Sequence, residues 1–452
     1  MAERLLVIGG DAAGMSAASQ ARRRRDADDL AITAFERGRF TSYSACGIPY
    51  LLGGLVEGHE ELIARSPQAF RERFEIDART LQEVVGIDTD ARRVHVRDLA
   101  RGREYDEPYD HLAIATGAEP LRPPIAGIDA DGILGIQTLE DGLVAQKLLG
   151  TDPASAVVVG GGYIGLEMAE ALVMRGIPVT LVEQAEQPMR TLDPEMGALV
   201  ADALREAGVE LMLGAPVEAF EHRDGRVEAV VTPDGSIPAE VVVLGLGTRP
   251  RSALAENAGI PVGETGGIVT DDHMHTRIDG VWAAGDCVET FHRVSKRPVA
   301  IALGTHANKQ GRVVGINLGG GDATFPGVVG TAISRICEVE VARTGLNRRE
   351  AEEAGFSIEE VKMDSRTRAG YFPGAEKMTI KLLAEAGSGR LLGGQIVGGA
   401  GSAKRIDVLA TCLWNEMTVH EIQGMDLAYA PPFAPVWDPV LIAARQLSDR
   451  MS

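Results

Sequence analysis

Two stretches of the chain share one pattern, and this pattern decides the fold. Leu5-Leu-Val-Ile-Gly-Gly-Asp-Ala-Ala-Gly14 and Ala156-Val-Val-Val-Gly-Gly-Gly-Tyr-Ile-Gly165 each run from an apolar strand into a glycine-rich turn and a helical pattern. Each is followed by a second apolar strand that ends in an acid, Glu36 in the first copy and Glu183 in the second. Strand, turn, helix, strand and terminal acid form one Rossmann βαβ unit. The sequence therefore predicts two dinucleotide sites in two α/β domains.

The residue types of the two turns have physical reasons. The first glycine permits the tight turn, the small middle residue lets backbone N–H groups approach a pyrophosphate, and the last glycine packs helix against strand. Gly160, Gly162 and Gly165 fit this pattern fully, whereas Asp11 occupies the middle position of the first copy. A carboxylate beside a pyrophosphate is unfavourable unless its side chain turns away. Asp11 is therefore a departure from the pattern.

Composition limits the class of protein. The 452 residues contain 45 Lys+Arg and 65 Asp+Glu, a net charge of −20, and 45% hydrophobic residues. This length suggests about three globular domains, and the acidic excess argues against nucleic-acid and membrane-surface binding. The 4 cysteines form no CxxC pair, so we expect no disulfide framework and no metal site. We find no signal-peptide pattern and no membrane-spanning run, and we expect a soluble, cytoplasmic protein.

Other segments extend the pattern. Residues 112–118 and 241–250 end apolar strands in glycine-containing turns, and residues 280–286 place a carboxylate just beyond a buried strand, where it faces a polyol in our interpretation. From about Pro326 apolar residues alternate in short stretches and helical patterns follow, which predicts an α+β domain after a glycine-rich hinge at 319–321.

Together these residues resemble the pyridine nucleotide-disulfide oxidoreductases, flavoproteins with two dinucleotide sites, over essentially the whole chain. The resemblance implies an α/β, glutathione reductase-like fold: two Rossmann-like dinucleotide-binding domains plus a C-terminal α+β dimerisation domain, and hence a homodimer. It implies an FAD-binding domain made of residues 1–112 and 246–324, an inserted NAD(P)H-binding domain over 113–245, and a dimerisation domain over 325–452.

The resemblance also implies which residues bind the cofactors. The first glycine turn and Glu36 would hold the ADP half of FAD, Asp286 its ribityl chain, and the second glycine turn the nicotinamide cofactor. The implied cofactor-binding residues are Gly9, Gly10, Ala12, Ala13, Gly14, Glu36, Arg37, Ser44, Thr116, Gly117, Gly160, Gly162, Tyr163, Ile164, Gly165, Glu183, Gly247, Gly285, Asp286 and Ala307. Because the Glu183 carboxylate accepts a ribose 2′-OH and repels a 2′-phosphate, we expect NADH. NADPH stays open, because Arg190 lies close enough in sequence to reach a phosphate.

A single cysteine marks the redox segment. The segment Phe40-Thr-Ser-Tyr-Ser-Ala-Cys46-Gly-Ile-Pro-Tyr50 lies where two-cysteine family members have a C-x4-C pair, but it holds one cysteine: Ser42 stands four residues before Cys46, and Tyr50 and Leu51 stand four and five residues after it. A disulfide within this segment is therefore excluded. The arrangement resembles the single-cysteine subgroup of coenzyme A-disulfide reductases, persulfide reductases and flavin-dependent NADH oxidases. The position of Cys46 at the start of a short helix predicts that its side chain favours the thiolate form.

The subgroup also suggests the proton donor and the substrate contacts. The stretch 426–439 contains no histidine, and the resemblance implies that Tyr429 and Tyr371 of the partner's dimerisation domain approach the sulfur instead; packing at the dimer interface is the alternative. Coenzyme A needs cations for its phosphates. The substrate-binding candidates are Arg22 in the run Arg22–Arg25, Ser42, Arg293 in a second basic patch with His292, and Asn308. Ordinary solvated cations are the alternative.

These observations lead to one favoured function. We expect an FAD-dependent NAD(P)H:disulfide oxidoreductase that reduces coenzyme A disulfide through a Cys46–S–S–CoA mixed disulfide. The expected cofactors are FAD and NADH, with NADPH as the alternative, and coenzyme A as mixed disulfide or substrate. An NADH oxidase that reduces O2, a persulfide or polysulfide reductase, and a redox-sensing flavoprotein without rapid turnover are the other hypotheses.

Overall fold

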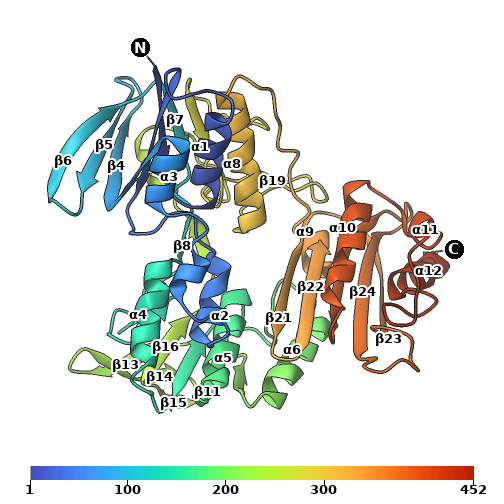
Figure 1. Ribbon diagram of the computed structural model, residues 1–452. Helices are drawn as coiled ribbons and strands as arrows, with labels where there is room; N and C mark the ends of the chain where they lie inside the picture. Colours follow the sequence, from blue (N-terminus) through green and yellow to red (C-terminus); the bar gives the residue numbers. More distant parts are fainter. Residues whose placement is uncertain (1, 452) are drawn as a thin grey trace.

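The computed structural model describes residues 2–451 and shows three packed domains (Figure 1). The first domain is built on a parallel sheet with the strand order β18-β7-β1-β2-β3. The run Leu5 to Ile8 in its central strand is buried throughout, as expected for a parallel strand covered on both faces. The strands are β1 (Glu3–Ile8), β2 (Leu30–Glu36), β3 (Ile76–Thr80), β7 (His111–Ile114) and β18 (Val281–Ala283), and an antiparallel sheet of β4 (Gln82–Asp88), β5 (Arg93–Asp98) and β6 (Arg103–Pro108) packs into the same core.

Two helices that are far apart in the sequence lie side by side on this sheet, α1 (Ala12–Arg22) and α8 (Gly304–Leu318) (Figure 1). Their close approach requires glycine. A Cβ on Gly311 would lie 2.1 Å from the carbonyl oxygen of Ala13, and one on Gly315 would lie 2.4 Å from that of Ala17. This packing brings the start of α8 to the first glycine turn. The remaining elements of the domain are α3 (Pro67–Phe74), α7 (Ala253–Asn257), β19 (Thr290–Phe291) and β20 (Pro298–Val299).

The second domain repeats the parallel arrangement, with the strand order β12-β11-β10-β16-β9. Its sheet consists of β9 (Ile133–Gly135), β10 (Ala156–Val159), β11 (Val179–Glu183), β12 (Glu210–Leu213) and β16 (Val241–Leu244). Three helices pack with it, α4 (Leu139–Leu149), α5 (Tyr163–Met174) and α6 (Pro194–Glu206), and an antiparallel sheet of β13 (Ala219–Arg223), β14 (Arg226–Thr232) and β15 (Gly235–Pro238) adjoins them.

The chain crosses between these two domains slightly later than predicted. The expected boundary after residue 112 falls inside β7, because this strand stays paired with β1 as far as Ile114, which lies opposite Ile8. The crossing occurs at β8 (Ala118–Pro120) and the return at β17 (Thr248–Pro250), and these two short strands pair antiparallel.

The third domain is a five-stranded antiparallel sheet with helices, as the alternating sequence predicts. Its strand order is β21-β22-β25-β24-β23. The strands are β21 (Ala332–Ile336), β22 (Val339–Gly345), β23 (Ile358–Arg366), β24 (Lys377–Glu385) and β25 (Leu391–Gly398), and the helices are α9 (Arg348–Glu353), α10 (Ile406–Trp414), α11 (Val419–Ile422) and α12 (Pro439–Met451). Over residues 2–451, no helix combines the length and the apolar character that crossing a bilayer needs.

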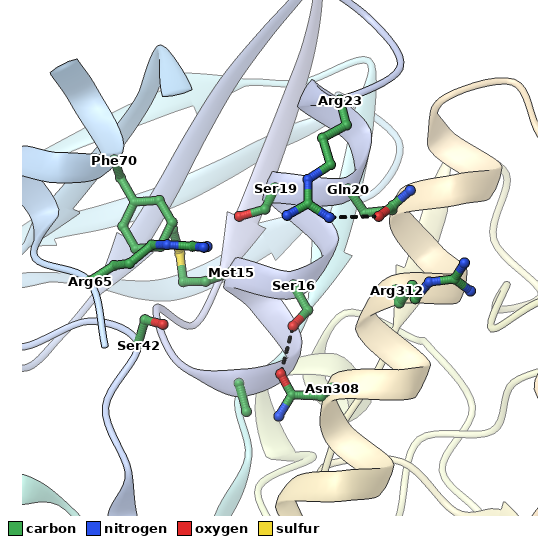
Figure 2. Close-up of a pocket in the computed structure, with 11 residues that line it drawn as sticks. Met15, Ser16, Ser19, Gln20, Arg23, Ser42, Arg65, Phe70, Asn308 and Arg312 are labelled. Carbon is green, nitrogen blue, oxygen red and sulfur yellow. Dashed lines mark hydrogen bonds between the residues drawn. The ribbon is translucent and has the colours of Figure 1, made fainter. Parts of the chain in front are cut away.

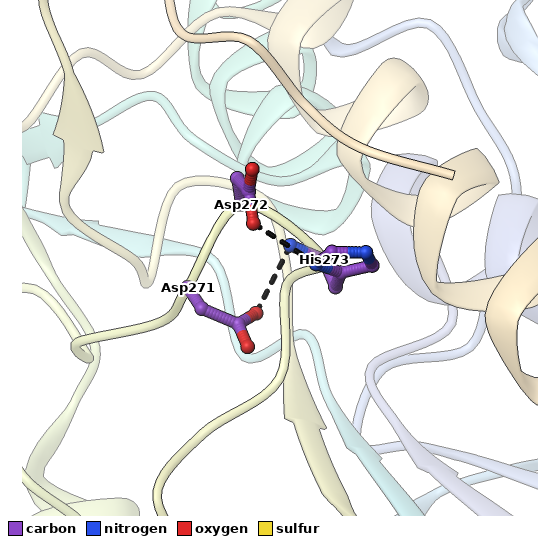
Figure 3. Close-up of side chains that lie close together, drawn as sticks. All are labelled: Asp271, Asp272 and His273. Carbon is purple, nitrogen blue, oxygen red and sulfur yellow. Dashed lines mark hydrogen bonds and ion pairs between the residues drawn. The ribbon is translucent and has the colours of Figure 1, made fainter. Parts of the chain in front are cut away.

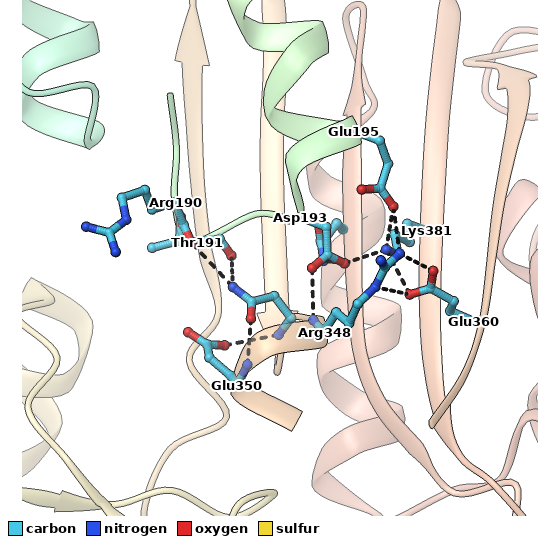
Figure 4. A network of polar contacts seen from close by, with 10 residues as sticks. Arg190, Thr191, Asp193, Glu195, Arg348, Glu350, Glu360 and Lys381 are labelled. Atoms are coloured by element: carbon cyan, nitrogen blue, oxygen red, sulfur yellow. Dashed lines mark hydrogen bonds and ion pairs between the residues drawn. The ribbon is translucent and has the colours of Figure 1, made fainter. Parts of the chain in front are cut away.

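Apolar contacts and one ionic network join the domains. Helix α2 (Ile48–Leu52) lies in sequence between β2 and β3 of the first domain, but its Ile48, Leu51 and Leu52 are buried in the core of the second. Each such side chain contributes about 1.5–3 kcal/mol on burial. Figure 4 shows the network, in which Lys381 of β24 contacts Asp193 and Glu195, which open α6.

Candidate active site

The first glycine turn has the geometry of a phosphate cradle. Gly9 has φ +114°, and a Cβ there would lie 2.1 Å from the carbonyl oxygen of Ala115. A Cβ on Gly14 would lie 2.0 Å from the carbonyl oxygen of Gly9. Glu36, at the end of β2, accepts hydrogen bonds from the backbone N–H groups of Gly10 (2.8 Å) and Gly38 (2.7 Å). The acid therefore closes the turn from the neighbouring strand, and its burial raises its pKa.

The second turn repeats this arrangement. Gly160 has φ +102°, and a Cβ on Gly165 would lie 2.0 Å from its carbonyl oxygen. Glu183 is buried and accepts from the N–H groups of Gly161 (2.7 Å) and Ala185 (2.8 Å). The two halves of the predicted repeat are thus equivalent in their hydrogen bonds as well as in sequence.

Asp286, a buried carboxylate just beyond β18, bears on whether the first cradle fits FAD. Oδ1 of Asp286 is buried and has no hydrogen-bond partner among the described residues. Burial raises the pKa of this carboxyl to about 6, although the backbone N–H of Leu303 opposes the shift. An unpartnered acceptor needs a donor, and a ribityl hydroxyl supplies one. The cradle, Glu36 and Asp286 therefore fit an FAD.

The other predicted cofactor residues lie near the two glycine turns, in the loop that carries Cys46, in α8 and at the domain crossing. Ala12 and Ala13 begin α1, and Ser44 precedes the 3₁₀ turn that carries Cys46. Thr116 donates its hydroxyl to the carbonyl oxygen of Arg251 (2.6 Å). Of the remainder, Arg37 is exposed beside Glu36, Gly117 and Gly247 have positive φ at the domain crossing, Gly162, Tyr163 and Ile164 open α5, Gly285 packs on Ala13, and Ala307 is buried in the first turn of α8.

Cys46 lies at the seam of the first two domains, in the 3₁₀ helix Ala45–Gly47, and its side chain is exposed. The expectation that a helix start lowers its pKa is wrong for this arrangement. Partial desolvation and the carboxylates of Glu167, Asp286 and Asp11 raise the pKa of the thiol, and a backbone hydrogen bond opposes them only in part. Helix α2 begins at Ile48, so Cys46 lies in the tighter turn before it.

Sequence reasoning missed Glu167. It lies on α5 and accepts a hydrogen bond from the hydroxyl of Ser334 in β21 (2.7 Å). Burial and the nearby Glu170 raise its pKa, and its charge acts on both Cys46 and Tyr50. The only signal in the sequence was its place two residues after the last glycine of the second turn.

A cavity of about 310 Å³ lies between α1, α8 and the loop that leads to Cys46 (Figure 2). Among the described residues that line it, three are arginines and none is acidic, on a chain of net charge −20. Ser16 of α1 donates to Asn308 of α8 across its floor (2.8 Å). The lining residues are Ala12, Met15, Ser16, Ser19, Gln20, Arg23, Ser42, Arg65, Phe70, Asn308 and Arg312. The cavity is therefore suited to an anion.

Two of the four predicted substrate residues, Ser42 and Asn308, line this cavity. The other two do not. The guanidinium of Arg22 donates to four backbone carbonyls, among them those of Leu30 (2.7 Å) and Phe74 (3.1 Å), and this leaves Arg23 to face the cavity. Arg293 lies over the ring of Trp414, 4.2 Å from its centroid, at the junction with the third domain.

The predicted tyrosines come together on the third domain. Tyr371 and Tyr429 are 78% and 47% exposed, and their hydrogen bond raises the pKa of Tyr429. Phe433, Val436 and Trp437 are exposed beside them in sequence. A surface of this composition is typical of an interface with another chain.

One group of possible metal ligands lies outside this site. Potential ligand atoms of Asp271, Asp272 and His273 lie within 4.8 Å of one another (Figure 3). The imidazole already pairs with Asp272 and Asp322, each at 2.9 Å, and Asp271 accepts the backbone N–H of His273. These contacts account for the group as a salt-bridged turn, and we assign it no catalytic role.

Known proteins match this fold over nearly its whole length. A family model described as pyridine nucleotide-disulphide oxidoreductase matches residues 3–311, and the dimerisation-domain model of the same family matches residues 331–439. The chain is 38% identical over 445 residues to the NAD(P)H sulfur oxidoreductase (CoA-dependent) of Pyrococcus abyssi, which covers 98% of both chains. It is 28% identical over 433 residues to the coenzyme A disulfide reductase of Staphylococcus haemolyticus, with 95% of this chain and 96% of the relative covered.

Comparison with a solved structure supports the same family. The NAD-dependent persulfide reductase from A. fulgidus superimposes with a TM-score of 0.96 at 40% identity, over 99% of this chain and 83% of that one. The predicted fold class and the third domain as a dimerisation domain are confirmed. The chain belongs to the pyridine nucleotide-disulphide oxidoreductases.

Proposed function

We propose that the enzyme uses NAD(P)H and FAD to reduce the disulfide of coenzyme A through Cys46. The observation that carries this proposal is the three-arginine cavity. The cavity opens beside Ser42, which lies four residues before Cys46, the one cysteine of the redox segment. A small disulfide without phosphates would have no use for this cluster of cations.

The cavity suits coenzyme A in charge and in length. Arg23, Arg65 and Arg312 supply forked donors for phosphate oxygens. A second cavity of about 520 Å³ shares Arg65 and adds Arg73 and the ring of Phe74, over which Arg65 stacks at 5.0 Å. Two adjoining basic cavities accommodate a long polyanionic carrier that places its sulfur toward Cys46.

Cys46 carries out a thiol–disulfide exchange with the substrate. Its thiolate attacks one sulfur of the coenzyme A disulfide, a Cys46–S–S–CoA bond forms, and one coenzyme A thiolate leaves and takes a proton. The first glycine turn, Glu36 and Asp286 would hold the FAD, which would relay the two electrons of a hydride from NAD(P)H to the mixed disulfide at Cys46. The second coenzyme A thiol and the Cys46 thiolate are the products.

The remaining roles are assigned by position. The first cradle with Glu36 and Asp286 holds FAD, and the second with Glu183 holds the nicotinamide cofactor, preferably NADH. In a homodimer, the exposed pair of Tyr371 and Tyr429 from the partner's dimerisation domain supplies the proton to the leaving thiolate. The four unpaired cysteines support a reducing, cytoplasmic location.

A persulfide of coenzyme A is the second candidate substrate, because one matched protein is named a CoA-dependent sulfur oxidoreductase and another a persulfide reductase. The same cavity and the same cysteine would serve it. NADH consumption should be measured with coenzyme A disulfide, with polysulfide plus coenzyme A, with glutathione disulfide, and with O2 alone. Turnover with the coenzyme A compounds and little with glutathione disulfide is expected; fast turnover with O2 alone would identify an oxidase.

The arginines provide the decisive variant. Arg23→Ala combined with Arg312→Ala should raise KM for coenzyme A disulfide about 10-fold or more, since each loses a charge-assisted hydrogen bond. Arg24→Ala, next to the cavity in sequence but outside its lining, is the matched control. Slow reoxidation by every acceptor, with an NADH-dependent change in oligomer size, would instead indicate a redox sensor.

A further inference from the structure

The two glycine turns differ at one position, and this difference is unexplained by dinucleotide binding. Asp11 lies where the second turn has Gly162, and both residues immediately precede a helix, α1 and α5. An aspartate at this place commonly accepts a hydrogen bond from the first turn of its helix. The Asp11 side chain makes no such bond. It therefore has another partner.

That partner is the loop that leads to Cys46. Oδ1 of Asp11 accepts the backbone N–H of Tyr43 at 3.1 Å. The preceding residue, Ser42, donates its N–H to the carbonyl oxygen of Gly10 at 2.9 Å. Two consecutive backbone groups of the loop are thus tied to two consecutive residues of the glycine turn.

The loop is also strained at this crossing. Ser42 has φ +48°, in the left-handed region that residues other than glycine rarely adopt. Its carbonyl oxygen accepts the backbone N–H groups of Ala64 (2.8 Å) and Arg65 (3.3 Å). Such a conformation persists only where its surroundings hold it, and the Asp11 bond is one of the contacts that do so.

Cys46 lies between two fixed points. Tyr43, three residues before it, is held by Asp11, and Ile48, two residues after it, is buried in the core of the second domain. The position of the sulfur depends on both attachments. Removal of the Asp11 bond would leave the bond between Ser42 and Gly10 as the hydrogen bond of residues 42–43 to the glycine turn, with Ala64 and Arg65 still bonded to the Ser42 carbonyl.

The charge of Asp11 makes this attachment costly. Burial, together with the carboxylates of Glu36 and Asp286, raises its pKa to about 6. A phosphate in the adjoining cradle would add another negative charge. A glycine, as in the second turn, would avoid this repulsion. The residue therefore opposes cofactor binding electrostatically, and of the two backbone N–H groups that favour its charge, those of Tyr43 and Ala12, that of Tyr43 has the stronger effect.

We propose that Asp11 is a positioning residue, whose carboxylate turns out of the phosphate cradle, holds the Tyr43 amide, and so fixes Cys46 beside the flavin. This inference rests on the proposed function of Cys46. It predicts that the first glycine turn has two roles: it binds the cofactor, and it holds the loop that leads to Cys46.

The test compares two substitutions in the FAD-loaded enzyme. Asp11→Gly restores the full glycine pattern and removes the acceptor, whereas Asp11→Asn keeps an acceptor oxygen and removes the charge. Three readouts apply: hydrogen exchange of peptides that cover residues 40–46, the alkylation rate of Cys46 by iodoacetamide followed by peptide mass spectrometry, and the charge-transfer absorbance between the Cys46 thiolate and oxidised flavin. None of them requires turnover.

In Asp11→Gly we expect bound FAD to be retained, exchange of the loop amides to rise about 10-fold, alkylation to accelerate, and charge-transfer absorbance per flavin to fall. Asp11→Asn should leave the exchange of the loop amides unchanged, and its alkylation rate and charge-transfer absorbance should change only by the small fall in thiol pKa that the lost charge causes. If Asp11→Gly leaves the three readouts unchanged, or if Asp11→Asn changes them as much as Asp11→Gly, the positioning role is overturned; in the latter case only the charge matters. Should Asp11→Gly fail to fold, Asp11→Ala replaces it in the same comparison.

The outcomes separate this inference from the proposed function. If the unsubstituted enzyme reduces no coenzyme A compound but the two variants still differ in loop exchange and alkylation, the substrate assignment fails and the positioning role stands. If turnover with coenzyme A disulfide is confirmed and the variants do not differ, the opposite holds.

Discussion

Lys381 and Asp193 form a buried ion pair between two domains, with 2.6 Å between Nζ and Oδ2 and side chains 1% and 2% exposed. The same ammonium contacts Glu195 (2.5 Å) and Glu360 (2.9 Å). The side-chain amide of Gln395 donates to Asp193 at 2.8 Å. The network fixes the start of α6, and with it the nicotinamide half of the molecule, on the dimerisation domain (Figure 4).

Lys381→Met should therefore weaken the joint between these domains. It leaves three carboxylates with only Arg348 as a nearby cation, and the loss of one partner from a buried ionic group costs about 3 kcal/mol or more. Differential scanning calorimetry should show a lower or divided unfolding transition.

Lys404→Met is the matched control for this prediction. Lys404 pairs with Asp407 on the surface, and their side chains are 73% and 56% exposed. An exposed pair contributes about 0–1 kcal/mol, so this variant should unfold like the unsubstituted protein. Equal effects of the two substitutions would show that the buried network has no special role.

Glu167 should control the acidity of the Cys46 thiol. Its carboxylate is the largest charged contribution to the raised pKa of Cys46. Glu167→Gln removes the charge and keeps an acceptor for Ser334, so the thiol pKa should fall. At pH 8 we expect alkylation of Cys46 by iodoacetamide to accelerate about threefold, because a larger share of the thiol is ionised. Glu170→Gln, which pairs with Arg335 instead, should leave the rate unchanged.

The glycine turns were predictable because steric contact dictates them. At Gly9, Gly14 and Gly165 a Cβ would lie within 2.1 Å of a carbonyl oxygen, so few sequences other than the observed ones can form these turns. The terminal acids were predictable from hydrogen bonding, since Glu36 and Glu183 accept backbone N–H groups of the turns themselves. Local chemistry was sufficient to predict the geometry of both turns.

The three-arginine cavity was less predictable because two helices that are distant in sequence build it. One residue along α1 is a rotation of about 100°, and this rotation separates Arg22, whose guanidinium serves loop carbonyls, from Arg23, which faces the cavity. Asn308 and Arg312 complete the wall only because glycines allow α8 to pack on α1. The sequence supplied the candidates, but the helix packing selects among them.

Cys46→Ser should abolish disulfide reduction while FAD stays bound, because the nucleophile is lost and the cradle is not touched. Turnover with coenzyme A disulfide should fall by about 10³-fold or more, and the flavin absorbance per protein should not change. Cys337→Ser is the control. Cys337 lies at the turn between β21 and β22 with a pKa raised by burial to about 11, and its loss should not affect turnover. Retained disulfide turnover in Cys46→Ser would refute the proposed mechanism.

His292 should make stability fall as the solution becomes acidic. Its side chain is 3% exposed, Nδ1 accepts the backbone N–H of Ser295 at 3.2 Å, and burial followed by the nearby Arg343 lowers its pKa to about 4. Between pH 6.5 and 4 the unfolded chain binds a proton here and the folded chain does not. The contribution is therefore complete above pH 6.5 and declines by about 3 kcal/mol as the pH falls to 4.

His292→Asn should remove this part of the acid sensitivity, whatever its effect on stability at neutral pH. His273 gives the opposite sign, because its carboxylate partners Asp322 and Asp272 raise its pKa. Its contribution is present below pH 6.5 and is lost as the pH rises through the folded-state pKa, so His273→Asn should lower the melting temperature most at acidic pH. Melting temperatures of both variants from pH 4.5 to 8 test the pair. Parallel curves for His292→Asn and the unsubstituted protein would mean that His292 is protonated in the folded state.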